Sequence, residues 1–310
     1  MAPRMSYEDI ERSSEKSIEE YLEVYIDVLE PRFSFDDIAG YEEVKERFRD
    51  IVVTPLKYGE ALKKAGIQPP TGVIVWGPLG TGRGHLIEAS AREAGVNYII
   101  IRGRECTAHE EVIRRAFDWA REHKPVLVHL MDLDWLAPRK DASYEWSDGT
   151  TRGKPDKLAL PQVHRAVHEE IASVAYDEEI FVAASCYRID VLDQAFTRTS
   201  MLGRKIYVPR PSYEDRLAIL RHYFSGVTLA EDALLEKLAE ETEYYVGWDL
   251  ESLARKAKLL ALQHTSGDGI VVTKEDIRRA MKSVEPWLTP AMARDYDRIR
   301  AEDCVHKYNF

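Results

Sequence analysis

Cysteine and long apolar runs are scarce in this chain of 310 residues. Its three cysteines, Cys106, Cys186 and Cys304, are far apart and odd in number, which excludes a disulfide framework and a zinc-ligand pattern. No apolar run is long enough to span a bilayer, and the N-terminal residues lack the apolar stretch of a signal peptide. These absences predict a protein of the reducing cytoplasm with no membrane contact.

Positive charge is also in deficit. Lys and Arg together number 43 and Asp and Glu 54, so the formal net charge is −11. An acidic chain is a poor binder of nucleic acids or anionic membranes, which argues against both as partners. Hydrophobic residues make up 45% and charged residues 31% of the chain, a composition typical of a soluble protein with a packed core.

Short apolar runs alternate with helical periodicity between residues 33 and 211. The runs are short and largely apolar, as strands covered on both faces should be, and lie at residues 72–76, 97–101, 126–131 and 180–184. Helical periodicity between the runs, as at 110–123, indicates repeated strand–helix–strand units. We therefore predict an α/β fold with a mostly parallel sheet and helices on both faces. The polar, glycine-containing segment 139–156 is expected to be a mobile surface loop.

Beyond Pro211 the apolar pattern has the period of a helix throughout, which predicts a small all-helical domain. The N-terminal residues have the spacing of one amphipathic helix. This helix either docks a partner protein or packs on its own domain. The predicted organisation is a helical arm (residues 1–31), an α/β domain (32–211), a helical domain (212–288) and a C-terminal extension (289–310).

A glycine-rich segment, Gly77-Pro-Leu-Gly-Thr-Gly-Arg-Gly84, lies directly between a predicted strand and a predicted helix. It is close to the phosphate-loop pattern G-x-x-x-x-G-K-[ST], in which backbone N–H groups surround a phosphate at a helix N-terminus. Arg83 replaces the lysine and keeps the charge, whereas Gly84 lacks the hydroxyl that would bind Mg²⁺. The cradle itself is backbone, so we predict binding of ATP or ADP through Pro78, Leu79, Gly80, Thr81, Gly82, Arg83, Gly84 and His85.

From about Phe35 to about Tyr296 the sequence resembles the AAA family of ATPases, which includes the valosin-containing unfoldases and the proteasomal ATPases. The resemblance is carried by Phe35-Asp-Asp-Ile-Ala-Gly40, Asp190-Val-Leu-Asp-Gln-Ala195, Pro211-Ser-Tyr-Glu-Asp-Arg216 and Gly247-Trp-Asp-Leu250. It implies a P-loop NTPase sheet followed by a helical lid domain. It also implies that Ile38, Ala39 and Gly40 line the adenine, and that Trp248 lies beside the ribose and base.

The same resemblance implies a second nucleotide motif at the end of the apolar run 126–131. The family's metal-positioning aspartate falls on Met131 and its catalytic glutamate on Asp132, which is shorter by one methylene. The residue that senses the γ-phosphate falls on Tyr187. The first arginine finger is lost, and Arg204 stands where the second would be. Asp132 and Arg204 are therefore the candidate catalytic residues, no metal ligand remains, and Mg²⁺ is not expected.

So many altered positions in one site favour a pseudo-ATPase, which is a regulatory or structural subunit of an AAA assembly that hydrolyses ATP very slowly or not at all. Its partners would be AAA subunits, in a homo- or hetero-oligomer, or another protein docked through the N-terminal helix. Two alternatives stay open. One is a divergent but active ATPase, and the other is a scaffold that binds no nucleotide because Trp248 fills the adenine pocket.

Overall fold

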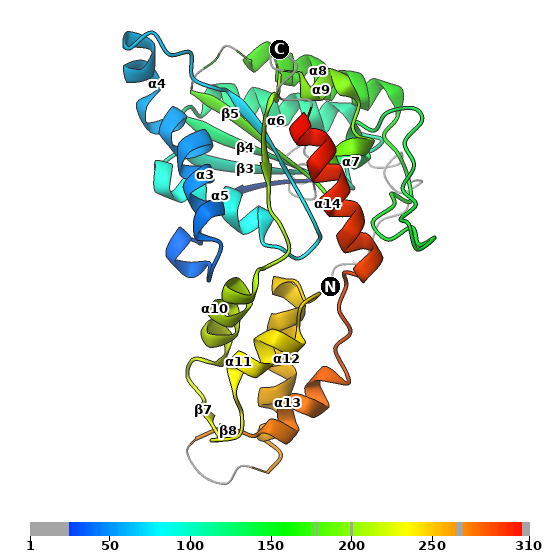
Figure 1. The fold of residues 1–310 in the computed structure, drawn as a ribbon. Coiled ribbons are helices and arrows are strands. Elements are labelled where there is room, and N and C mark those ends of the chain that lie inside the picture. The colour runs from blue at the N-terminus through cyan, green and yellow to red at the C-terminus, as the bar shows by residue number, and fades with distance from the viewer. Residues whose placement is uncertain (1–24, 176, 178, 199–200, 265–268, 306–310) are drawn as a thin grey trace, which may run out of the picture.

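The computed structural model describes residues 25–175, 177, 179–198, 201–264 and 269–305. Figure 1 shows an α/β part built around a six-stranded sheet, and a smaller helical part at one end of it. The last helix runs back from the helical part along the α/β part. The predicted fold class, a mostly parallel sheet followed by a helical lid, is confirmed.

The sheet has the strand order β1-β3-β4-β5-β2-β6, and all its pairs are parallel except β1 with β3. Four of its strands coincide with the predicted apolar runs, because a strand covered on both faces needs apolar side chains on both. The strands are β1 (Ile26–Leu29), β2 (Gly72–Trp76), β3 (Asn97–Arg102), β4 (Val126–Met131), β5 (Ile180–Cys186) and β6 (Arg204–Tyr207).

Strand β1 corrects the prediction of a helical arm over residues 1–31. Residues 26–29 pair with β3 in an antiparallel ladder, in which Ile26 lies opposite Ile101. A strand this short has no clear period of its own, and its pairing partner is about 70 residues away in the chain. Residues 1–24, which contain the rest of the predicted arm, lie outside the described residues.

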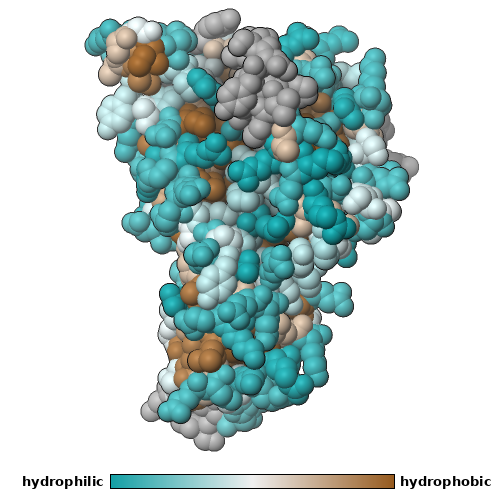
Figure 2. All heavy atoms as spheres, viewed as in Figure 1, coloured by the Kyte–Doolittle hydropathy of each residue, from teal (hydrophilic) through white to brown (hydrophobic). Residues whose placement is uncertain are grey.

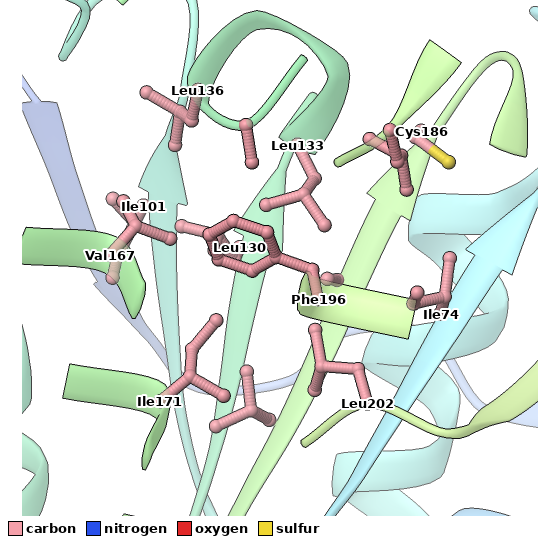
Figure 3. Packing of buried hydrophobic residues seen from close by; sticks show 14 of the residues in the cluster. Ile74, Ile101, Leu130, Leu133, Leu136, Val167, Ile171, Cys186, Phe196 and Leu202 are labelled. Carbon is pink, nitrogen blue, oxygen red and sulfur yellow. The ribbon is translucent and has the colours of Figure 1, made fainter. Parts of the chain in front are cut away.

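Helices cover both faces of the sheet and bury two hydrophobic clusters. One cluster joins the sheet to α6 (Glu110–Glu122), α8 (Pro161–Val174) and α14 (Pro290–Val305). Figure 3 shows its packing around Leu130, Val167 and Phe196. The other joins the opposite face to α3 and α5 and continues into the lid. The helices of the α/β part are η1 (Phe35–Asp37), α3 (Glu42–Phe48), η2 (Arg49–Val53), α4 (Thr54–Lys64), α5 (Arg83–Ala94), α6 (Glu110–Glu122), α7 (Leu133–Leu136), α8 (Pro161–Val174), η3 (Ile189–Val191) and α9 (Gln194–Thr197).

The lid begins with a capped helix. Ser212 and Asp215 exchange side-chain and backbone hydrogen bonds in a capping box, which fixes where the helix starts. The lid is helical as predicted, except for two short strands, β7 (Thr228–Leu229) and β8 (Val271–Val272), of two residues each. These strands pair with each other in parallel. Its elements are α10 (Tyr213–Phe224), β7 (Thr228–Leu229), α11 (Leu235–Glu241), α12 (Gly247–Ala261), β8 (Val271–Val272) and α13 (Lys274–Met281), and α14 (Pro290–Val305) follows them.

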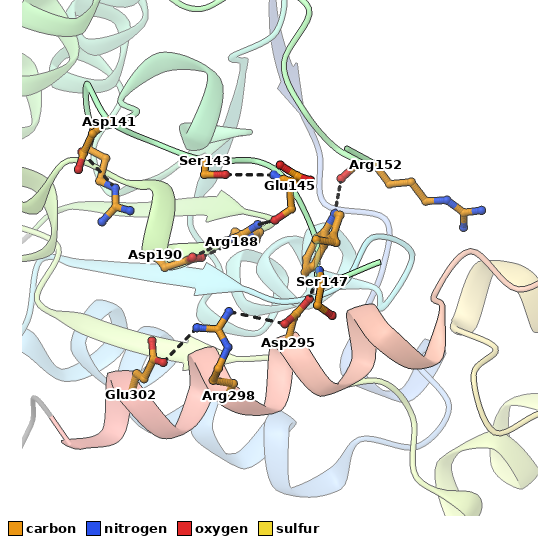
Figure 4. A network of polar contacts seen from close by, with 12 residues as sticks. Asp141, Ser143, Glu145, Ser147, Arg152, Arg188, Asp190, Asp295, Arg298 and Glu302 are labelled. Atoms are coloured by element: carbon orange, nitrogen blue, oxygen red, sulfur yellow. Dashed lines mark hydrogen bonds and ion pairs between the residues drawn. The ribbon is translucent and has the colours of Figure 1, made fainter. Parts of the chain in front are cut away.

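Segment 139–156, expected to be a mobile surface loop, forms no helix or strand, and residues 146 and 147 pack against α14 (Figure 4). The Ser147 backbone N–H donates to Asp295 Oδ2 at 2.8 Å. The Trp146 side chain is buried, and its ring centroid lies 5.0 Å from that of Tyr296. These contacts join the segment to a helix far along the chain, which no local pattern reveals.

Candidate nucleotide site

The glycine-rich segment forms the predicted loop between β2 and α5. Gly77, Gly80 and Gly82 have φ values of 145°, 80° and 84°, a region that side chains other than glycine's disfavour. A Cβ on Gly77 would lie 2.1 Å from the carbonyl oxygen of Val208, so only glycine fits there. The Thr81 hydroxyl donates to the Pro78 carbonyl oxygen at 2.9 Å. The first N–H groups of a helix have no partner within it, so the loop brings several donors together at the start of α5.

The resemblance names two segments around the base, the start of α12 and residues 38–40, and the structure shows what each contacts. The Trp248 backbone N–H donates to the Gly80 carbonyl oxygen at 3.2 Å, which joins the start of α12 to the loop. Trp248 is 56% exposed, so it is an open aromatic surface beside the loop rather than a packed core residue. Residues 38–40 are partly buried, and the Tyr41 N–H that follows them donates to Asp215 Oδ1 at 2.6 Å. The lid is thus hydrogen-bonded to the glycine loop through α12 and to Tyr41, the residue after segment 38–40, through α10.

The Arg83 side chain lies in the interior, away from solvent. Its Nη1 donates to the Cys186 carbonyl oxygen, and its guanidinium carbon lies 4.7 Å from the ring centroid of Tyr187. The strand register explains this contact, because Trp76 at the end of β2 pairs with Cys186 at the end of β5. The residue at the lysine position therefore contacts the residue at the sensor position. The neighbouring His85 is exposed, and its ring lies 4.4 Å from that of Phe33.

Asp132, at the position of the catalytic glutamate, is held in an ion pair. It follows β4 in a left-handed conformation with φ of 55°. Arg104 Nε donates to Asp132 Oδ2 at 2.6 Å, and Arg104 Nη2 donates to the Tyr187 hydroxyl. The register again brings these residues together, since Arg102 pairs with Met131 across β3 and β4. The carboxylate is therefore neutralised by a neighbouring guanidinium.

Asp134 lies behind this ion pair and is fully buried. Its Oδ2 accepts the Tyr187 backbone N–H at 3.1 Å, whereas its Oδ1 has no hydrogen-bond partner among the described residues. Burial, and secondarily the charge of Asp132, raise the pKa of Asp134 to about 7. The Tyr296 hydroxyl, which enters from α14, likewise has no partner among the residues described. Burial raises the pKa of Tyr296 well above its ordinary value, against the effect of Arg83.

Arg204 is exposed at the start of β6 and does not join this site. β6 runs parallel to β2, with Arg204 beside Val73 and Tyr207 beside Trp76. Arg204 therefore lies near the end of the sheet opposite the glycine loop. The structure brings Asp132 close to Arg104 and Tyr187, but it does not bring Asp132 and Arg204 together.

Sequence reasoning missed two residues of the site, Arg104 and Tyr296. Arg104 had a usable signal, because it follows the carboxyl end of a parallel strand, the edge at which α/β sheets place their ligands. Tyr296 had none, since only the return of α14 to the α/β part brings it near Asp134 and Arg83.

Three features define a P-loop nucleotide-binding fold. They are a sheet of buried parallel strands, a glycine loop that leads into a helix, and a helical lid hydrogen-bonded to that loop. Residues 73–210 match the family described as "ATPase family associated with various cellular activities (AAA)", and residues 232–279 match the AAA+ lid domain. The chain therefore belongs to the AAA ATPases, with an AAA domain followed by an AAA lid.

Its relatives include AAA proteins of archaea. The chain is 32% identical over 321 residues to Protein SAV of Sulfolobus acidocaldarius, covering 93% of this chain and 40% of that protein. It is 31% identical over 294 residues to the cell division cycle protein 48 homolog of Archaeoglobus fulgidus, covering 89% and 38%. It is 30% identical over 262 residues to the proteasome-activating nucleotidase of Methanopyrus kandleri, covering 82% and 57%. The chain thus spans about 40% of the length of the first two relatives. Among the described residues, no helix is both long and apolar enough to cross a membrane.

Proposed function

We propose that this chain is a hydrolysis-deficient AAA subunit, a pseudo-ATPase that binds ATP or ADP and has a regulatory or structural role in an AAA assembly. The observation that carries the proposal is the Arg104–Asp132 ion pair at 2.6 Å. The acid at this position should polarise the attacking water. A carboxylate already neutralised by a guanidinium is poorly suited to that task, and it is also one methylene too short to keep the family's geometry.

An exposed arginine and exposed apolar side chains support a role in an assembly. Arg204 is exposed away from the chain's own loop, where it is available to a neighbouring subunit's nucleotide. The face seen in Figure 2 is mostly hydrophilic, with a hydrophobic patch over the lid. Large apolar residues exposed on the lid include Leu234, Trp248, Leu259, Leu262 and Val271, and such residues are typical of protein contact surfaces. Buried free thiols at Cys106 and Cys186 are compatible with the cytoplasm.

The proposal predicts ATP turnover near background. With Mg²⁺ and ATP, phosphate release by the purified chain should change by less than about twofold on Asp132→Ala, because the ion-paired carboxylate contributes nothing that can be lost. The exposed Asp156 provides a matched control, Asp156→Ala, in the same domain. Mg²⁺-dependent turnover that falls roughly a hundredfold on Asp132→Ala, but not on Asp156→Ala, would establish the active-ATPase alternative instead.

A separate experiment tests whether Arg204 acts on the nucleotide of a neighbouring subunit. The chain is mixed with an AAA subunit that has intact motifs and forms a complex with it in analytical ultracentrifugation. We expect Arg204→Ala to lower the partner's ATP turnover by roughly 10³-fold if this arginine acts as the finger on the partner's nucleotide. A normal rate in a complex that still assembles would remove Arg204 from this role.

A further inference from the structure

Magnesium, which the AAA fold implies, does not fit the residues of this site. Gly84 offers no side-chain oxygen where the hydroxyl ligand belongs, although a Cβ there would meet only His129 Cε1 at 3.9 Å. Met131 offers a thioether, a soft ligand that hard Mg²⁺ does not favour. No group of three or more His, Cys, Asp or Glu side chains in the described ranges is placed to hold a metal ion. If a nucleotide binds here, another positive charge must neutralise its phosphate groups in place of Mg²⁺.

Arg104 supplies such a charge at the same edge of the sheet. Its guanidinium is fixed by the Asp132 carboxylate, the Tyr187 hydroxyl and the ring of Trp135, whose centroid is 5.0 Å away. The side chain is still 45% exposed. An arginine has five N–H donors, and its contacts to described residues use two of them. The remaining donors have the geometry that binds phosphate oxygens in pairs.

A second guanidinium reinforces the first. Arg83 and Arg104 approach the same ring, with their guanidinium carbons 4.7 Å and 5.4 Å from the Tyr187 centroid. The β2–β5 register places Cys186, the residue before Tyr187, directly beside Trp76, the residue before the loop. Two guanidiniums thus lie around Tyr187 in a chain whose net charge is −11, and Arg104 is the exposed one because Arg83 is buried. Within the described ranges, the carboxylate that forms an ion pair with Arg104 is that of Asp132.

We propose that Arg104 takes the place of the divalent cation, so that a nucleoside di- or triphosphate binds to this chain without metal. The inference rests on the proposed nucleotide binding and goes beyond it by naming the residue that replaces the metal. A guanidinium neutralises and hydrogen-bonds the phosphate chain, as Mg²⁺ does elsewhere. It does not activate water, which agrees with a subunit that binds nucleotide without hydrolysing it.

The test is calorimetric titration of ATP, and separately ADP, in buffers containing either MgCl₂ or EDTA. We expect binding in EDTA to be at least as tight as with Mg²⁺, because metal bound to the nucleotide competes with the guanidinium. Arg104→Gln should weaken binding in EDTA by about tenfold to a hundredfold, the range expected for lost charge-assisted hydrogen bonds. The exposed Arg115 on α6 provides the control Arg115→Gln, which should bind as the unmodified chain does.

A second variant, Asp132→Asn, should change the affinity in the direction opposite to Arg104→Gln. A gain in affinity cannot come from loss of folding. It removes the carboxylate that competes with phosphate for Arg104, so binding in EDTA should tighten by roughly threefold to tenfold. If Asp132 instead helped to hold Mg²⁺, the same variant would weaken binding in MgCl₂. Thermal unfolding of each variant establishes that it is folded before its affinity is compared.

The outcomes separate this inference from the proposed function. Binding that requires Mg²⁺ would overturn the role of Arg104, while the absence of hydrolysis would still hold. Unchanged binding by folded Arg104→Gln would overturn that role as well. No binding in either buffer would overturn both the inference and the nucleotide-binding part of the proposed function, and would favour a scaffold.

Discussion

Replacing Tyr296 with alanine should lower the free energy of unfolding by about 3 to 5 kcal/mol, as expected for a large aromatic residue removed from a core. Tyr296 is only 1% exposed and belongs to the hydrophobic cluster on the α6–α8 face of the sheet. Its ring lies 5.0 Å from that of Trp146, so the substitution leaves a cavity between α14 and segment 139–156. Urea denaturation followed by circular dichroism measures the change.

The matched control is Tyr58→Ala on α4, where the tyrosine is 58% exposed. This change should cost less than about 0.5 kcal/mol, the usual range for surface substitutions. If Tyr296→Ala costs no more than this control, α14 does not pack on the α/β part in solution.

Tyr296→Phe separates the ring from its hydroxyl. The hydroxyl has no hydrogen-bond partner in the described part of the chain, and leaving such a group buried is unfavourable. We therefore expect Tyr296→Phe to be neutral or slightly stabilising in the same denaturation experiment. A loss above about 1 kcal/mol would show that the hydroxyl makes a hydrogen bond in solution.

The second large effect concerns the pH dependence of stability and comes from Asp134. Its pKa is raised to about 7 in the folded chain, first by burial and then by Asp132. In the unfolded chain it would be an ordinary aspartate, so between about pH 4 and pH 7 the folded state holds the extra proton. Stability from this group is therefore lost as the pH rises through that window. From pH 5 to pH 8 the expected loss is roughly 2 to 3 kcal/mol, at about 1.4 kcal/mol per pKa unit.

Asp134→Asn should remove this loss. The amide oxygen can still accept the Tyr187 N–H, and asparagine does not ionise. The variant's stability should therefore fall less than that of the unmodified chain between pH 5 and pH 8, by the same 2 to 3 kcal/mol or so. Asp156→Asn, at an exposed position, is the control and should follow the unmodified chain. Parallel curves for all three proteins would mean that Asp134 is ionised throughout this range.

Local patterns predicted much of the fold. The strands β2 to β5 are runs of apolar residues, and each is buried because helices cover both faces of the sheet. Helix α13 begins at Lys274 because a local capping residue precedes it, since the Thr273 hydroxyl accepts a hydrogen bond from the Asp276 N–H. These features depend on residues close together in the chain, so a short window contains all the information that they need.

Features that depend on distant partners were not predicted. Strand β1 forms only because β3 offers an open edge about 70 residues further along the chain. Segment 139–156 is a loop, as its composition predicts, but its contacts with Asp295 and Tyr296 of α14 were not predicted. In both cases the local composition is compatible with several structures, and the contact made in the folded chain selects one of them.

By itself, the sequence determined which chemical groups the nucleotide site can offer. Glycines at 77, 80 and 82 specify a backbone cradle, and the residues at 84 and 131 carry no hard oxygen ligand for a metal in any conformation. Only the tertiary structure decided where the charges lie, because Arg104 meets Asp132 through the pairing of β3 with β4, and Arg83 reaches Tyr187 through that of β2 with β5. The identity of a side chain determines its chemistry, whereas its partners follow from strand pairings between residues far apart in the chain.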